Sequence, residues 1–139
     1  MSQNQQTASM SDNQSQPRYN RIVVKAGTTL LTGSTDRLDL EMMSSLVGQV
    51  ARLQFAGRQM MIVSSGAVAV GRKILKGQQQ GRDVPVRQVL AAVGQGRLLQ
   101  AYEQLFDWHG IPVAQALLTR RDLSDRHGYL NIRNTLLGL

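Results

Sequence analysis

The sequence contains no cysteine, which excludes disulfides, cysteine-ligated zinc and thiol catalysis from these 139 residues. Aromatic residues make up only 4% of the chain, so any core must be built from Val, Leu, Ile, Ala and Met. No apolar run approaches the roughly 20 residues of a membrane-spanning helix. Residues 1–17 also lack the apolar segment of a signal peptide. We therefore expect a cytoplasmic protein without membrane association.

Acidic residues are scarce. Nine Asp and Glu stand against 16 Lys and Arg, which gives a formal net charge of +7. Basic residues gather between Arg52 and Arg97, where Asp83 is the only acid. Such a cluster attracts nucleic acid, an anionic surface or a phosphorylated ligand. We interpret it as a solvated surface whose acidic counterpart is missing, and we expect no nucleic-acid partner.

The polar composition of residues 1–17 predicts a disordered tail, and residues 18–139 predict one folded domain. Strands are predicted at 20–25, 59–64 and 112–118. Helices are predicted from Asp39 to about Gly57, over 67–76, over 85–110 and over 126–139, with loops at 30–37, 77–84 and 119–125. This alternation predicts an α/β fold, a three-layer sandwich with a mainly parallel sheet. Because the chain ends inside a helical pattern, we expect the domain to be incomplete at its C-terminus.

Apolar residues recur at helical spacing in two of these segments. The first stripe is Leu40, Met43, Leu46, Val47, Val50 and Leu53, and the second is Val86, Val89, Leu90, Val93, Leu98, Ala101, Leu105 and Trp108. We expect Trp108 to anchor the core or an interface. His109 is expected to cap a helix C-terminus, and Asp122 and Asp125 to cap the last helix. His127 has no metal-ligand spacing to any partner, so no metal site is predicted.

A possible phosphate site follows the first strand. Lys25 closes the strand, Gly27 lets a backbone N–H approach an anion, and Thr28 and Thr29 add hydroxyl donors. From the pattern alone, a solvated lysine before an ordinary turn is the favoured alternative, because the chain has no GxxxxGK[ST] motif.

A second possible anion site follows the second strand, at Ser64, Ser65, Gly66 and Ala67. Small residues at a strand-to-helix junction expose helix N-terminal amides, which bind carboxylate or phosphate. Simple N-capping of the helix by Ser64 or Ser65 explains the pattern equally well. In parallel sheets, ligands bind at the carboxyl ends of the strands. Two such sites on neighbouring strand ends fit phosphoryl transfer between two anions, which needs mainly positioning and charge neutralisation.

Four ordered segments resemble the glutamate 5-kinases, which are amino acid kinases. The segments are Val23–Thr28, Val63–Arg72, Leu90–Gln95 and Leu117–Arg120, and a later stretch from Asp125 to Leu136 agrees with them. The resemblance covers about residues 21–139. The segments SSGA and AAVGQ favour this family over relatives that act on aspartate, N-acetylglutamate or UMP.

The resemblance implies transfer of the ATP γ-phosphoryl group to the γ-carboxylate of L-glutamate, with Mg²⁺, at the first step of proline biosynthesis. By position, Lys25 matches the catalytic lysine on the ATP phosphates, and Gly27 and Thr28 match the adjoining phosphate loop. Ser65 matches the serine that holds glutamate, with Gly66 and Ala67 beside it. A homo-oligomer is expected for the full-length enzyme.

Two departures from the family pattern stand out. Ala26 is smaller than the usual apolar residue, which predicts a packing change. The family's Asn/Asp-rich glutamate loop, nucleotide pocket and second catalytic lysine are not found, so we expect this chain alone to lack useful kinase activity. The alternative is a non-catalytic fragment, a pseudokinase or a split subunit that only binds partners or ligand.

Overall fold

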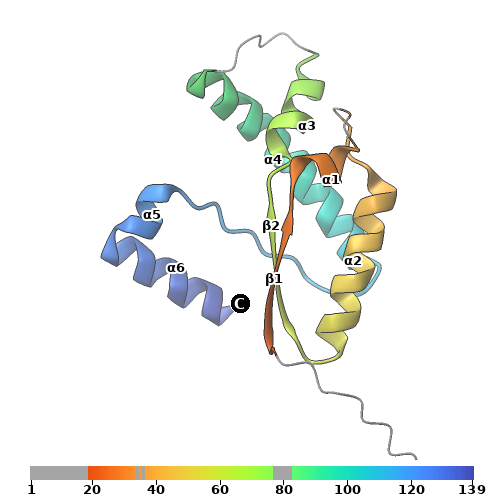
Figure 1. Cartoon of the computed structure of the whole chain (residues 1–139), viewed down its shortest axis with the longest axis vertical. Coiled ribbons are helices and arrows are strands. Elements are labelled where there is room, and N and C mark those ends of the chain that lie inside the picture. Colours follow the sequence, from red (N-terminus) through yellow and green to blue (C-terminus); the bar gives the residue numbers. More distant parts are fainter. Residues whose placement is uncertain (1–18, 34, 36, 77–82) are drawn as a thin grey trace, which may run out of the picture.

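The computed structural model describes residues 19–33, 35, 37–76 and 83–139. Its elements are β1 (Arg21–Ala26), α1 (Thr28–Thr32), α2 (Leu40–Phe55), β2 (Gln59–Ser64), α3 (Ala67–Ile74), α4 (Val84–Asp107), α5 (Arg120–Ser124) and α6 (Arg126–Gly138). The two strands lie side by side, with α2 and α4 on one flank and α5 and α6 on the other (Figure 1). The predicted α/β class with a parallel sheet is confirmed. The predicted tail at 1–17 and most of the loop at 77–84 fall outside the described residues. No helix in the described part of the chain is long and apolar enough to cross a membrane.

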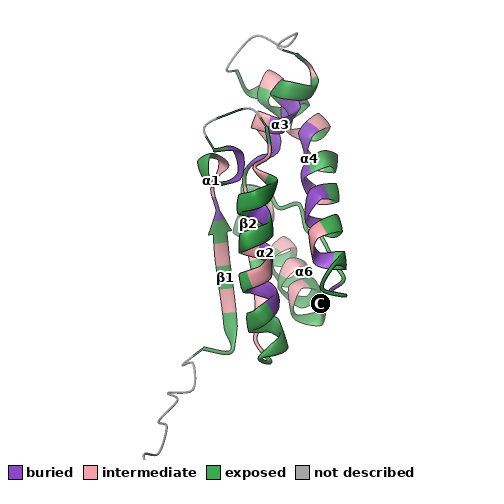
Figure 2. Cartoon of the chain, turned by 90° about the vertical axis from the view of Figure 1, so that its right-hand side faces the viewer, coloured by how far each residue is buried: buried purple, intermediate pink, exposed green. Residues whose placement is uncertain are grey.

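The sheet of the described residues consists of β1 and β2, paired in parallel from Arg21 opposite Gln59 to Ala26 opposite Ser64. Successive side chains of a strand point to opposite faces. One face packs against the hydrophobic core through Val24, Met60 and Ile62, whereas Val23, Met61 and Val63 of the other face are exposed. The core therefore lies between one face of the sheet and helices α2 and α4 (Figure 2).

Helix α2 forms as the sequence predicts. The Asp39 carboxylate accepts a hydrogen bond from the Met42 backbone N–H at 2.9 Å, which satisfies one of the free amides at the helix start. The helix ends ahead of Gly57, whose φ of 80° suits glycine. Its buried stripe is Met43, Val47, Val50 and Ala51.

Helices α3 and α4 approach each other so closely that no side chain fits at Gly71 or Gly94, where they cross. A Cβ atom built on Gly71 would lie 1.9 Å from the Leu90 carbonyl oxygen. A Cβ atom on Gly94 would lie 1.9 Å from the Ala67 carbonyl oxygen and 2.5 Å from the Gly71 nitrogen. Both glycines are buried, so the backbones of the two helices are in direct contact at this crossing. The crossing fixes where α3 begins, three residues after the end of β2.

The predicted third strand at 112–118 is wrong, because the segment is irregular. The Ile111 N–H returns to the Phe106 carbonyl oxygen, and Gly110 has a φ of 65°, so the chain turns sharply at the end of α4. Pro112 brings no backbone N–H for a ladder. Within the described residues, the segment joins no sheet. Its apolar run therefore connects α4 to α5 without pairing.

Two predicted loops contain short helices instead. The loop expected at 30–37 begins with the end of α1, which runs from the extended Gly27 to the left-handed Gly33, with Leu31 buried. The connector expected at 119–125 contains α5, where Thr119 and Asp122 exchange the two hydrogen bonds of a capping box. Hydrogen bonds from the Thr119 hydroxyl and N–H hold the pKa of Asp122 below its usual value. Asp122 therefore belongs to α5, and Asp125 caps α6 as predicted.

The predicted stripe of α4 is only partly buried. The buried residues are Leu90, Gly94, Leu98, Ala101, Tyr102 and Phe106. Trp108 is 89% exposed, so it is not part of the core. It stands at the end of α4, just before the turn at Gly110.

We predict that Gly94→Ala destabilises the protein by about 1–3 kcal/mol, because the added Cβ overlaps backbone atoms of α3 that cannot move independently. Gly96→Ala, in the same helix, is the matched control. No atom lies within 4 Å of its Cβ position, so it should stabilise the protein by up to about 1 kcal/mol through helix propensity. Urea unfolding followed by circular dichroism measures both. Equal effects of the two variants would contradict the close crossing.

A second prediction concerns the helix caps. Asp39→Ala should cost about 1 kcal/mol, because it removes the hydrogen bond to the Met42 N–H. Asp83 occupies the same position before α4 but makes no side-chain cap bond. Asp83→Ala should therefore cost less than half as much in the same urea titration. A larger loss from Asp83→Ala would show that the caps are assigned wrongly.

Candidate active site

The two predicted anion loops lie next to each other. Ala26 and Ser64, the last residues of β1 and β2, are register partners, so both strands end at the same level. Each strand is followed within three residues by a helix, α1 after Gly27 and α3 after Gly66. Figure 1 shows both helix starts together at one end of the sheet. Parallel pairing therefore gathers the site residues that the sequence singled out.

Hydrogen bonds join the two loops directly. The Ser65 N–H donates to the Ala26 carbonyl oxygen at 3.3 Å, and the Thr28 hydroxyl donates to the Ser65 carbonyl oxygen at 2.9 Å. The Thr28 and Ser65 hydroxyl oxygens are 3.5 Å apart. A ligand held by one loop would therefore lie within reach of the other.

Lys25 stands at the edge of this site. It pairs in register with Val63, and its side chain is exposed on the sheet face that also carries Val23. Among the carboxylates of the described residues, none forms an ion pair with it. The ammonium group is therefore available to an anionic ligand at the carboxyl end of the sheet.

The glycines of the two loops differ in what they require. A Cβ atom on Gly27 would meet nothing within 4 Å, so packing within the described chain does not demand glycine there. A Cβ atom on Gly66 would lie 3.2 Å from Leu31 Cδ1, a tight contact with the core. Gly27 thus leaves open space beside its backbone, where a ligand can approach. A side chain at Gly66 would instead press on Leu31 of α1, which would have to shift.

The alternative interpretation of the serines, simple N-capping, is wrong. The N-cap of α3 is Gly66, and no side chain in the described residues makes a cap hydrogen bond there. The first amides of α3 therefore lack a side-chain partner, and an anion could satisfy them. The hydroxyl of Ser65, which is exposed, is directed to the Thr28 side of the junction.

Sequence reasoning missed Tyr102. This residue of α4 is buried, and its hydroxyl lies 3.3 Å from the Ser64 hydroxyl oxygen, as donor to it. Burial raises the pKa of Tyr102 above its ordinary value of 10.0, although the bond to Ser64 acts in the opposite direction. The side chain therefore stays protonated and remains a donor at neutral pH. The available signal was its position four residues after Leu98 on the buried face of α4.

The donors of the site suit phosphate and carboxylate oxygens. A lysine, the Ser65 hydroxyl and helix amides without a side-chain partner are all hydrogen-bond or charge donors to anions. Mg²⁺ prefers oxygen ligands such as carboxylates. Within the described ranges, no three His, Asp or Glu side chains converge on one point. The donors among the described residues thus fit phosphate and carboxylate groups.

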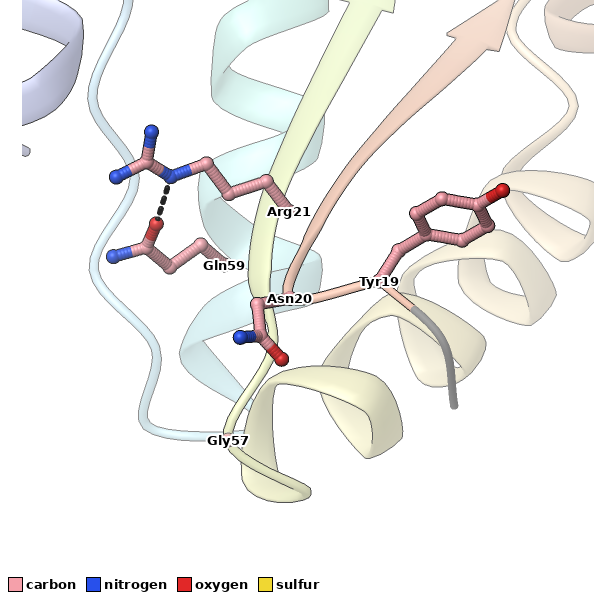
Figure 3. Close-up of a pocket in the computed structure, with 5 residues that line it drawn as sticks. All are labelled: Tyr19, Asn20, Arg21, Gly57 and Gln59. Carbon is pink, nitrogen blue, oxygen red and sulfur yellow. Dashed lines mark hydrogen bonds between the residues drawn. The ribbon is translucent and has the colours of Figure 1, made fainter. Parts of the chain in front are cut away.

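A hollow of about 710 Å³ lies at the opposite, amino end of the strands (Figure 3). The Arg21 Nε donates to Gln59 Oε1 at 2.7 Å across its wall. Arg58 Nη1 donates to Asn20 Oδ1, also at 2.7 Å. These bonds link the start of β1 to β2 and to the turn before it. The two hydrogen bonds therefore brace the amino end of the sheet, which is remote from the anion loops.

The basic cluster is distributed over separate places. Arg58 is engaged with Asn20 at the amino end of the sheet. Lys73 and Arg97 line a groove of about 360 Å³ between α3 and α4, together with Arg37 from outside the cluster. Lys73 and Arg97 thus lie together in this groove, whereas Arg58 lies apart from them.

Comparison with known proteins identifies the family. The model of the amino acid kinase family matches residues 20–139. The glutamate 5-kinase of Dehalococcoides mccartyi strain CBDB1 is 55% identical over 121 residues, which are 87% of this chain and 32% of that protein. Those of Photobacterium profundum and Escherichia coli O1:K1 / APEC are each 47% identical, over 96% and 94% of this chain.

The chain spans about a third of the length of these relatives, between 32% and 35%. The resemblance to glutamate 5-kinases inferred from the sequence is confirmed. The family match covers both strands, both anion loops and every helix described above. The chain belongs to the amino acid kinase family.

Proposed function

We propose that this chain provides the phosphate loop of a glutamate 5-kinase and one of its glutamate-binding segments, Ser65 to Ala67. The reaction is ATP-dependent phosphorylation of the γ-carboxylate of L-glutamate, the first step of proline biosynthesis in the cytoplasm. The observation that carries the proposal is the hydrogen bond from the Thr28 hydroxyl to the Ser65 carbonyl oxygen, at 2.9 Å. It couples the two loops that the resemblance assigns to the two substrates. The names of the curated relatives support the same activity.

In this proposal, Lys25 is catalytic. Its ammonium group neutralises the oxygens of the ATP γ-phosphate, while the backbone amides of Gly27 and Thr28 hold the phosphates. Ser65, with the amides of Gly66 and Ala67, holds glutamate. A carboxylate oxygen attacks the γ-phosphorus as the bond to the ADP oxygen breaks, which yields ADP and glutamyl 5-phosphate. Two anions repel each other, so lysine and helix amides contribute mainly by lowering that repulsion. ATP is accompanied by Mg²⁺ in this proposal, but the roles given to these residues do not depend on the metal.

The test is a chimera in which residues 20–139 replace the matching segment of the D. mccartyi glutamate 5-kinase. We expect glutamate-dependent ADP release. Lys25→Met should lower kcat on the order of 100-fold, as loss of a transition-state donor does. Ser65→Ala should raise the KM for glutamate about 5-fold, as loss of one ligand hydrogen bond does.

Lys73→Met is the matched control, because Lys73 is an exposed lysine in the last turn of α3. It should leave kcat and KM within about twofold, the range in which surface substitutions remain. An active chimera that keeps its kcat in Lys25→Met would refute the catalytic assignment. A folded chimera without glutamate-dependent ADP release would refute the proposed function.

A further inference from the structure

One face of α4 contacts the whole junction between β2 and α3. The face consists of residues four apart, Leu90, Gly94, Leu98 and Tyr102. Residues at this spacing lie on the same side of a helix. As residue numbers rise along α4, the numbers of the residues that they contact fall. Leu90 contacts Gly71, Gly94 contacts Ala67 and Gly71, Leu98 contacts the Gly66 position, and Tyr102 contacts Ser64.

Three of these four contacts are steric. The Leu90 carbonyl and Gly94 touch the backbone of α3, and Leu98 Cδ1 lies 3.8 Å from the Cβ position of Gly66. Tyr102 differs from them, because its hydroxyl makes a directional hydrogen bond to Ser64. Steric contact limits how closely the junction can approach α4. A hydrogen bond also fixes its orientation.

Ser64 is followed by the residue to which the glutamate-binding role is assigned. The N–H and carbonyl of Ser65 are held by Ala26 of β1 and Thr28 of α1. The hydrogen bond from Tyr102 to Ser64 adds a third attachment, which comes from α4. The Ser64–Ser65 dipeptide is thus held by three different elements, and Tyr102 provides the attachment from α4.

We propose that Tyr102 is a positioning residue for the junction between β2 and α3, acting through Ser64 on the direction of the Ser65 hydroxyl and of the first amides of α3. The proposal rests on the proposed function for its effect on glutamate, but its effect on the loop is independent of activity. Tyr102 touches neither substrate in this scheme. Its phenol ring fills the core, and its hydroxyl orients the loop.

Tyr102→Phe separates these two roles, because it keeps the ring and removes the hydroxyl. In the full 139-residue chain, amide hydrogen exchange measured by NMR should be about 5-fold faster at the Ser65 N–H, the effect of losing one hydrogen bond. The N–H of Val50, a buried residue of α2, reports general destabilisation and should change less. Tyr129→Phe, which removes an exposed hydroxyl in α6, is the matched control and should change neither amide.

The kinetic readout uses the chimera described above. Tyr102→Phe should raise the KM for glutamate about 5-fold, with kcat and the KM for ATP within about twofold. Ser64→Ala should reproduce the effect, and the double variant should add nothing further, since both remove the same bond. Ser64→Thr keeps a hydroxyl and should remain close to wild type. It also serves as the folded comparison if Ser64→Ala proves unstable.

Selective acceleration at Ser65 together with a higher KM for glutamate would support the proposal. Equal acceleration at Ser65 and Val50, or none, would overturn it and leave Tyr102 with a packing role only. Selective acceleration in the chain combined with an inactive wild-type chimera would refute the proposed function while the positioning of the loop by Tyr102 stands.

Discussion

The direct backbone contact between α3 and α4 is the constraint on which the rest of this structure depends. Gly71 and Gly94 leave no room for side chains between the two helices. The crossing sets the depth and direction at which α3 leaves the sheet. Since α3 starts directly after the short junction that follows β2, the same contact determines where the amides of Gly66 and Ala67 lie. The geometry of the candidate site is therefore set by packing behind it rather than by the loops alone.

The sheet provides the other half of this arrangement. Parallel strands deliver their following loops to one edge, and here the loops are further tied by Thr28 and Ser65. The result is a short stretch of backbone amides and hydroxyls next to a lysine without a carboxylate partner in the described residues. Such a site attracts anions through its donors alone. The chemistry proposed for the family suits it, because phosphoryl transfer to a carboxylate requires two negative groups to meet.

The sequence predicted the elements whose signals are local. Both strands and α2 follow from β-branched runs, from helical spacing and from the Asp39 cap. The third strand failed because an apolar run does not reveal whether a partner edge is present, and Pro112 with the turn at Gly110 sends the chain elsewhere. Helix α1 was missed because its five residues carry no periodic pattern, only Gly27 and Gly33 at its ends.

The residues of the candidate site could be predicted from the sequence, but the contacts from α4 that hold them in place could not. The SSGA and Lys25 segments could be found by motif, and parallel topology implied that they meet. The role of Gly94 and the bond from Tyr102 to Ser64 depend on which face of α4 meets α3, and a list of apolar residues does not reveal this. The N-capping alternative for Ser64 and Ser65 was likewise decided by geometry, because the cap is Gly66.

The register of the two strands has a consequence for how the chain avoids misfolded forms. Side chains alternate between the faces of a strand, so a shift of β1 by one residue against the core would turn Val24 outward and Lys25 inward. A buried, unpaired lysine is strongly unfavourable. The shifted form would also separate Ala26 from Ser64 and break the bond between the two loops. A chain that pairs its strands incorrectly therefore loses stability and the ligand-binding arrangement together. The form with the intact site is thus also the more stable one.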